Sequence, residues 1–137
     1  MQEQTLLQGR LIHIKYKNIV SGEIINLFSL YGKSNVNKIY VDSLFKKLDD
    51  ELDKGLENNI IVGDFNFVTS VLDRNSSSLN QIDQLYKSTW QNLEIKHHFL
   101  NVFRKLYPKR RLCSFLQTGG NSKIMYRSIL FIFCFNG

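Results

Sequence analysis

An aspartate and an asparagine two positions apart are the residues of this chain whose types and spacing most clearly suggest chemistry. Asp64 and Asn66 lie in a run that reads Asn-Ile-Ile-Val-Gly-Asp-Phe-Asn-Phe-Val over residues 59–68. Side chains of an extended segment alternate between two faces, so both polar groups should share one face, about 6.6 Å apart at about 3.3 Å of rise per residue. A carboxylate beside a carboxamide can contact a phosphate, a metal ion or an attacking water. The same letters also suit a strand that runs into an ordinary turn, because Gly, Asp and Asn are common turn formers.

The apolar residues of this run predict a strand inside a sheet. Residues 60–62 are β-branched without interruption, which is typical of a strand covered on both faces. Gly63 follows, where the missing Cβ lets backbone or ligand come close. Phe65 and Phe67 fall on the face opposite the two polar groups and can enter a core.

The segments before this run predict a strand–helix–strand unit. Residues 10–17 alternate between apolar and polar types, and residues 23–30 read as a second strand, so the two form a meander or hairpin. Apolar residues recur at helical spacing over 36–56, with Asn35 as a cap and Gly55 at the end. If the flanking strands are parallel, the crossover is right-handed.

Later segments predict further scaffold. A second helix is expected from Ser78, where Gln81 completes a capping box, and Asn101 should cap a short helix that ends at Leu106. The apolar run 129–135 is either a buried strand or an aggregation hazard.

Two sets of polar residues could be assigned as metal ligands, but each has a simpler explanation. The acidic residues from Asp49 to Asp53 point around the first helix in succession, so a solvated face explains them. His97 and His98 are adjacent and cannot both face one metal from regular structure.

Composition and charge favour one domain with a polyanionic partner. The 137 residues, 43% of them hydrophobic, are enough for a real core. The net charge of +6 suits nucleic acid, because Lys and Arg release counterions from phosphates, although a basic protein that simply stays soluble is the alternative. The cations that we expect to contact a nucleic-acid backbone are Arg74, Lys109, Arg110 and Arg111. An ordinary exposed ion pair with Asp73 is the alternative for Arg74, and a solvated turn is the alternative for the other three.

The chain shows no sign of export or membrane insertion. Cys113 and Cys134 are too few for a disulfide framework and lack metal-ligand spacing. The amino terminus has no basic leader followed by an apolar core, and the longest apolar run is too short to span a bilayer. An intracellular protein without a membrane is therefore expected.

Several segments together resemble one family. Ile-Val-Gly-Asp-Phe-Asn at 61–66 resembles the signature of the endonuclease/exonuclease/phosphatase superfamily, which includes apurinic endonucleases and DNase I. Further features narrow the resemblance to the endonuclease domain of non-LTR (LINE-type) retrotransposons, namely Asn26–Tyr31, Leu72–Arg74 and Leu100–Pro108. It covers about Gly9 to Lys123, so residues 1–137 read as a single partial domain whose tail from residue 124 diverges.

The resemblance implies a fold and a mechanism. The fold class is α/β, an incomplete two-sheet sandwich of the DNase I-like type. The implied activity is Mg²⁺-dependent phosphodiester hydrolysis in DNA, with Asp64 and Asn66 as metal-site residues. In that mechanism Asp64 deprotonates or positions water, Asn66 holds the phosphate or the leaving side, and the Tyr31 hydroxyl bonds the substrate phosphate. Lys33 stands where the family usually has proline.

The resemblance breaks at both ends. Met1–Gln8 cannot supply the family's first asparagine and its metal-binding glutamate, and residues 122–131 lack its Ser-Arg-Ile-Asp-Arg-Ile-Tyr segment and later Asp-His pair. If a one-nucleotide shift is made in codons assumed for 124–130, they read Ser-Cys-Ile-Asp-Arg-Phe, which resembles the lost motif, so the tail is hypothesised to be a frameshift.

The family segments missing from this chain determine the function that we expect for it. We expect an endonuclease fragment with little or no activity alone, nuclear if functional, whose partners are DNA and either the missing part of the domain or a reverse transcriptase. Uncovered apolar sheet surface should make it poorly soluble or dependent on a partner. The alternative is a non-catalytic basic module that binds nucleic acid or protein, and a phosphatase or sphingomyelinase-like activity ranks lower.

Overall fold

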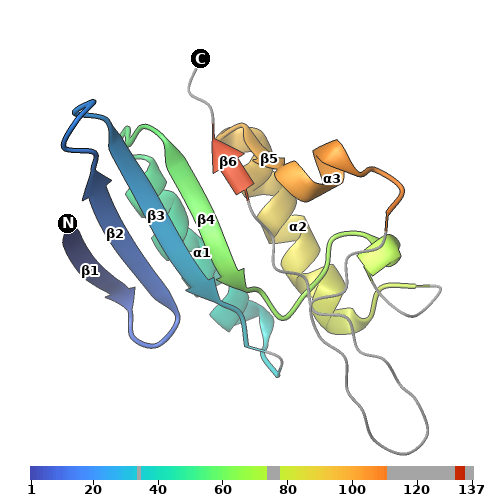
Figure 1. Ribbon diagram of the computed structural model, residues 1–137. Helices are drawn as coiled ribbons and strands as arrows, with labels where there is room; N and C mark the ends of the chain where they lie inside the picture. The colour runs from blue at the N-terminus through green and yellow to red at the C-terminus, as the bar shows by residue number, and fades with distance from the viewer. Residues whose placement is uncertain (34, 74–77, 111–131, 135–137) are drawn as a thin grey trace, which may run out of the picture.

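A single mixed sheet with two long helices on one side forms the protein in the computed structural model (Figure 1). The structure describes residues 1–33, 35–73, 78–110 and, for the backbone, 132–134. The sheet has six strands in the order β1-β2-β3-β4-β6-β5. The strands are β1 (Gln2–Leu7), β2 (Leu11–Lys17), β3 (Ile24–Tyr31), β4 (Asn59–Asp64), β5 (Phe99–Asn101) and β6 (Ile132–Cys134). The helices are α1 (Lys38–Leu52), α2 (Gln81–Lys96), α3 (Val102–Leu106) and the short 3-10 turn η1 (Val71–Asp73).

The strand–helix–strand prediction is confirmed. Strands β2 and β3 form an antiparallel hairpin, and β3 pairs in parallel with β4 after the α1 crossover. Strand β1 extends the sheet beyond β2 and was not predicted, because its first four residues are exposed and polar and carry no alternating apolar pattern. The apolar tail run does contain a strand, β6, which pairs antiparallel with both β4 and β5.

Helix α1 is shorter than its apolar pattern predicted. It begins at Lys38, where the Asn37 side chain accepts a hydrogen bond from the backbone N–H of Tyr40, so the expected cap at Asn35 is wrong. After the helix ends at Leu52, Gly55 adopts a positive φ of 71°, a conformation that glycine reaches without strain.

Helix α2 begins at Gln81 rather than at Ser78. Asn80 is the cap: its side chain accepts from the N–H of Asp83 at 2.7 Å, and the Asp83 carboxylate accepts in return from the N–H of Asn80. Asp83 is fully buried and also accepts from the N–H of Val68. The capping box therefore lies two residues later than predicted, because a tertiary contact selects it.

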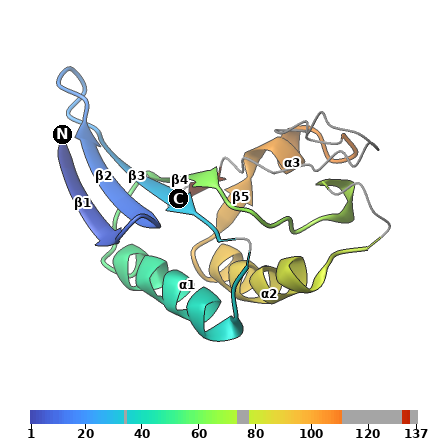
Figure 2. The ribbon, with the colours of Figure 1, turned by 90° about the horizontal axis from the view of Figure 1, so that it is seen from below.

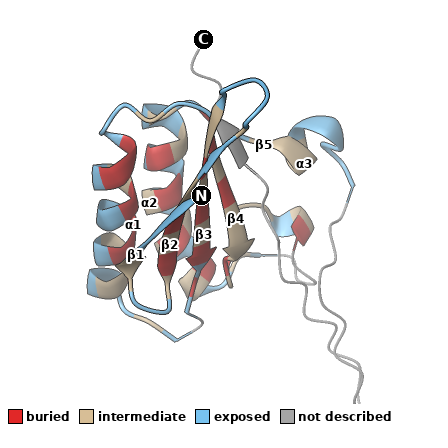
Figure 3. Ribbon diagram, turned by 60° about the vertical axis from the view of Figure 1, so that its left-hand side comes forward, coloured by how far each residue is buried: buried red, intermediate tan, exposed pale blue. Residues whose placement is uncertain are grey.

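The hydrophobic core lies between the sheet and the two long helices (Figure 3). Phe65 and Phe67 are 0% and 1% exposed, which confirms the prediction that both enter the core. Phe67 stacks on Tyr86 with ring centroids 4.5 Å apart, and Phe65 meets Trp90 edge to face at 5.3 Å. These rings anchor the segment that follows β4.

A buried polar contact fixes the hairpin register on the helix-covered face. His13 of β2 is 9% exposed, stacks on Phe28 and places its Nε2 2.9 Å from Asn26 Oδ1. The Asn26 amide donates in turn to the carbonyl of Glu57, 2.7 Å away. His13 is thus a satisfied core residue, not one of the solvent-facing polar residues of its strand.

The opposite face of the sheet carries an apolar row. Ile14, Leu27 and Ile60 are paired across β2, β3 and β4, and all three are half-buried. Helices α1 and α2 both lie on the other side of the sheet (Figure 2), so the described ranges place no long helix on this row. None of the helices in those ranges has the length and hydrophobicity that a membrane crossing requires.

Paired substitutions on β3 test the difference between the two faces. Phe28 is 0% exposed, so Phe28→Ala should lower the free energy of unfolding by about 3 to 5 kcal/mol. Its neighbour Leu27 points the other way and is half-buried, so Leu27→Thr should cost only about 1 kcal/mol or less. Urea unfolding measures both, and equal losses would contradict the assignment of an open face.

Candidate active site

The parallel pairing of β3 and β4 brings the predicted site residues together. Tyr31 and Asp64 are the last residues of their strands and are register partners, so they stand side by side at the carboxyl rim of the sheet. Neighbouring strands lie about 4.8 Å apart. Tyr31 is 44% exposed and Asp64 is partly buried, so both are accessible from solvent.

Two glycines permit the close approach at this rim. A Cβ at Gly63 would lie 1.8 Å from the carbonyl oxygen of Leu30, and one at Gly32 would lie 1.9 Å from that of Phe65. The N–H of Gly32 donates to the carbonyl of Asp64 at 2.8 Å. Of the two possibilities foreseen for Gly63, close contact with backbone or with a ligand, the structure has the first.

Asn66 reaches the rim through a turn rather than along an extended strand. Strand β4 ends at Asp64, so the expected strand through residue 68 is wrong, and the extended geometry used to calculate the 6.6 Å spacing does not apply. Asn66 has a φ of +53°, and its N–H donates to Asp64 Oδ1 at 3.2 Å, because an aspartate readily accepts from the backbone two residues on. The Asn66 amide donates to the carbonyl of Gly32 at 2.7 Å, which ties the turn to β3.

Arg10 is a rim residue that the sequence analysis missed. Its guanidinium carbon lies 4.9 Å from the centroid of the Tyr31 ring, and its carbonyl accepts from the N–H of Tyr31. Pairing of Leu11 with Leu30 continues one step to Arg10 and Tyr31, so the hairpin register was the signal that would have found it. A cation here makes the rim suitable for an anionic group.

The residues at the rim are only part of a Mg²⁺ site. Mg²⁺ takes oxygen ligands, usually one or two carboxylates together with waters and substrate phosphates. Asp64 already accepts from Asn66 and has further interactions. Within the described ranges it belongs to no group of three His, Cys, Asp or Glu side chains close enough to share an ion. The donor types suit Mg²⁺, but these residues do not form a complete site.

A different acidic group lies at the other end of the sheet. Asp49, Asp53 and His97 place one ligand atom each within 4.8 Å of one another. The Lys96 ammonium sits among them, 2.8 Å from Asp49 and 2.7 Å from Asp53, and His97 Nε2 lies 2.6 Å from Asp49. The expectation of a solvated acidic face is wrong for Glu51, which is 5% exposed, and for Asp49, which is partly buried and joins α1 to α2 through Lys96. Asp53, one turn after Asp49, is 52% exposed, as expected, although it also pairs with Lys96. Helix α1 runs from the carboxyl end of β3 to the amino end of β4, so this group is remote from Asp64.

The predicted nucleic-acid contacts are only partly described. Lys109 and Arg110 are exposed on the segment after α3, whereas Arg74 and Arg111 lie outside the described residues. The possibility of an exposed pair at Asp73 and Arg74 is wrong for Asp73, which is 4% exposed and pairs with Arg104.

The fold is the α/β fold of the DNase I-like nucleases, which confirms the expected fold class. No protein-family model matches the sequence, and no curated protein matches it. The described ranges hold one sheet of the expected two-sheet sandwich.

Several solved structures share this fold. An AP endonuclease from Leishmania major matches 91% of this chain with a TM-score of 0.66 and 16% identity. A 3′ phosphatase from Neisseria, bound to a product DNA hairpin, matches 90% of this chain with a TM-score of 0.67 and 15% identity. An AP endonuclease from Archaeoglobus fulgidus matches 91% of this chain with a TM-score of 0.62 and 18% identity. The chain spans 46%, 51% and 52% of the lengths of these three proteins, about half in each case.

The substitution Gly32→Ala tests the close contact between Gly32 and the Phe65 carbonyl at the rim. The added Cβ would overlap the Phe65 carbonyl, so Gly32→Ala should lower the free energy of unfolding by about 3 kcal/mol. Gly22→Ala is the matched control, since Gly22 has a φ of +74° but open space around it, and it should cost about 1 to 2 kcal/mol. Thermal and urea unfolding of both variants compare the two costs, and a smaller loss at Gly32 would refute the contact.

The Asp49 contacts predict a loss of stability in acid. Burial raises the pKa of Asp49, but hydrogen bonds from Lys96 and His97 outweigh burial and lower the pKa below its ordinary value of 3.8. A lowered folded-state pKa gives stability that is present above pH 3.8 and is lost as the pH falls through the folded-state pKa. Asp49→Asn should therefore destabilise at pH 7, by about 1 kcal/mol or less, and progressively less below pH 4.

The control for this pH effect is Asp50→Asn on the same helix. Asp50 pairs with Lys46 one turn away, and its side chain is 51% exposed. Its replacement should change the unfolding midpoint little at any pH. A cost for Asp49→Asn that stays constant from pH 7 to pH 2 would contradict the role given to its carboxylate.

Proposed function

We propose that this chain is a fragment of a metal-dependent DNA endonuclease of the non-LTR retrotransposon type. The observation that carries the proposal is the rim itself, where Tyr31 stands opposite Asp64 and Asn66 is tied to Gly32. The same fold is found in AP endonucleases and in a 3′ phosphatase with bound DNA product, which supports DNA as the partner. The retrotransposon assignment depends on the motifs at 26–31, 72–74 and 100–108.

Each rim residue has a proposed role in phosphodiester hydrolysis. The Asp64 carboxylate orients an attacking water or takes its proton. The Asn66 side chain holds the phosphate, and the exposed Tyr31 hydroxyl donates to it. Arg10 adds positive charge beside Tyr31. When bound, a Mg²⁺ ion supplies charge neutralisation and water activation.

The fragment should be inactive alone, because the described residues near Asp64 do not complete a metal site. Purified 137-residue protein incubated with supercoiled plasmid and Mg²⁺ should give no nicking above the background of the Asp64→Ala variant. Nicking by the unmodified protein that needs Mg²⁺ and disappears in Asp64→Ala would overturn this expectation and would establish a complete site. A nuclear location and a partner that carries the rest of the domain, or a reverse transcriptase, belong to the same proposal.

The retrotransposon origin has its own test in genomic DNA. Sequence upstream of the coding region should encode the strand with the metal-binding glutamate, and sequence downstream should encode a reverse transcriptase. The codons for 124–130 should restore the Ile-Asp-Arg segment after a shift of one nucleotide. Flanks without any of these features would remove the retrotransposon assignment and leave the fold unaffected.

A non-catalytic basic module is the second candidate function. Lys105, Lys109 and Arg110 are exposed and form no ion pair within the described ranges, which favours contact with a polyanion. Binding to duplex DNA that weakens steeply with salt, without cleavage and unchanged by Asp64→Ala, would favour this module over the nuclease fragment.

A further inference from the structure

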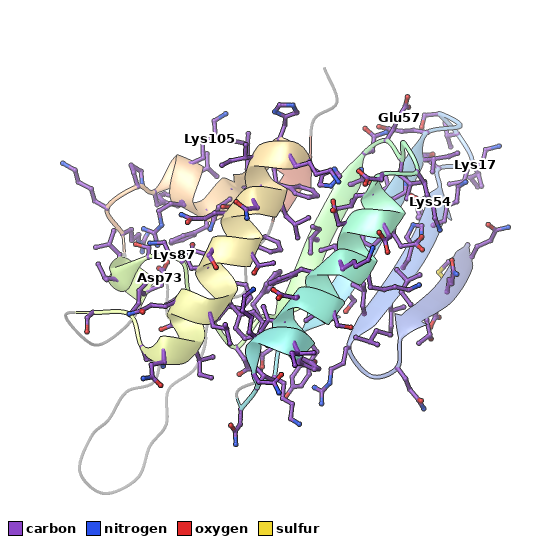
Figure 4. All side chains as sticks on the ribbon, turned by 180° about the vertical axis from the view of Figure 1, so that it is seen from behind. Lys17, Lys54, Glu57, Asp73, Lys87 and Lys105 are labelled. Atoms are coloured by element: carbon purple, nitrogen blue, oxygen red, sulfur yellow. The ribbon has the colours of Figure 1, made fainter. Side chains whose placement is uncertain are left out.

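One guanidinium joins two segments that are far apart in the sequence. Arg104 of α3 bonds through Nη2 to the carboxylate of Asp73 in η1, and the two side chains are 22% and 5% exposed. Figure 4 shows Asp73 on η1, with Lys105 on α3. Such a charge-assisted bond, largely shielded from water, is stronger than an exposed pair.

The other arm of the same guanidinium gathers the loop after α3. Arg104 Nη1 is directed at the carbonyl oxygens of Tyr107, Pro108 and Arg110, at 3.4, 3.3 and 2.9 Å. The N–H of Arg110 closes the turn by donating to the carbonyl of Tyr107 at 3.2 Å. Only a planar, multi-donor group can satisfy a carboxylate and several carbonyls at once, so lysine cannot replace arginine here.

Asp73 belongs to a segment that begins at Asp64 of the candidate active site and is anchored in the core. The segment from Asp64 to Asp73 is anchored in the core by Phe65 and Phe67, and the N–H of Val68 donates to the buried Asp83. Arg104 therefore connects the 107–110 loop, through an anchored segment, to the rim that holds Asp64.

The charges of the loop are left available by this arrangement. Arg104 is neutralised by Asp73, whereas Lys109 and Arg110 are exposed and have no carboxylate partner in the described ranges. The Arg110 guanidinium lies 5.6 Å from the Tyr107 ring centroid, which holds it along the loop.

We propose that Arg104 and Asp73 are positioning residues that hold the 107–110 loop in one conformation, so that Lys109 and Arg110 form a preformed binding surface for nucleic-acid backbone phosphates. The proposal rests on the proposed action on DNA and adds how the cations are placed. A loop ordered before binding loses less entropy when the phosphates dock.

A double-mutant cycle tests this role with a fluorescein-labelled 20-base-pair duplex in EDTA at several salt concentrations. Lys109→Ala with Arg110→Ala should weaken binding and reduce the salt slope by about 1.8, since each lost phosphate contact removes about 0.9. Arg104→Met should weaken binding by about 5-fold to 10-fold in the natural background but by less than about 2-fold in the double-alanine background. Equal losses in both backgrounds would overturn the positioning role.

Trypsin cleavage after Lys109 and Arg110, measured by mass spectrometry without DNA, reports the loop directly. Arg104→Met and Arg104→Lys should both speed cleavage at these bonds, and Lys105→Met, which also removes a cation from α3, should not. Because Arg104→Met leaves a buried carboxylate unpaired, the combined Asp73→Asn and Arg104→Met variant keeps the test valid if the single variant unfolds.

The two readouts separate this inference from the proposed function. Unchanged trypsin cleavage in both the Arg104→Met and the Arg104→Lys variants would overturn the positioning role even if DNA binds. Absence of DNA binding by the natural protein would reject both the phosphate surface and the action on DNA, while faster cleavage in the variants would still show that Arg104 orders the loop.

Discussion

The close parallel pairing of β3 and β4 is the constraint on which the candidate site depends. Gly63 lets the backbone of β4 pass the Leu30 carbonyl, and Gly32 lets the chain beyond β3 pass the Phe65 carbonyl. A side chain at either position would push the strand ends apart. Only with both contacts in place does Tyr31 stand opposite Asp64, so the geometry of the rim is a consequence of two missing side chains.

Beyond the rim, the chain is held by polar groups that each serve two segments. Asp83 caps α2 and at the same time accepts from the N–H of Val68. Asn66 bonds the carboxylate of Asp64 and the carbonyl of Gly32. Polar groups that bond to two segments in this way favour one arrangement, because each alternative leaves a donor or an acceptor without a partner. The segment after β4 is therefore ordered without belonging to a helix or strand.

Periodicity predicted the elements well where burial is one-sided and local. The hairpin, α1 and the burial of Phe65 and Phe67 were predicted from alternation or helical spacing, and β4 was predicted from its unbroken β-branched run. The pairing of Tyr31 with Asp64 followed only from the fold, since the parallel register is a tertiary property.

What the pattern missed was decided by contacts across the structure. The start of α2 moved to Asn80 because Asp83 also holds Val68, and Asn66 left the extended conformation because Asp64 accepts from its N–H. Arg10 carries no local signal at all, and the Asp49 contact with Lys96 requires two helices to be packed side by side. The identity of the site residues remains a prediction, although the geometry brings Asp64, Asn66 and Tyr31 together.

The buried contact between His13 and Asn26 has a consequence for how the hairpin folds. A slip of one residue between β2 and β3 would turn Leu27 toward the helices and leave the imidazole without its amide partner. Mispaired hairpins would thus carry an unsatisfied polar group as well as a misplaced apolar one. The contact between the imidazole and the amide therefore favours the native alignment of the two strands over mispaired ones.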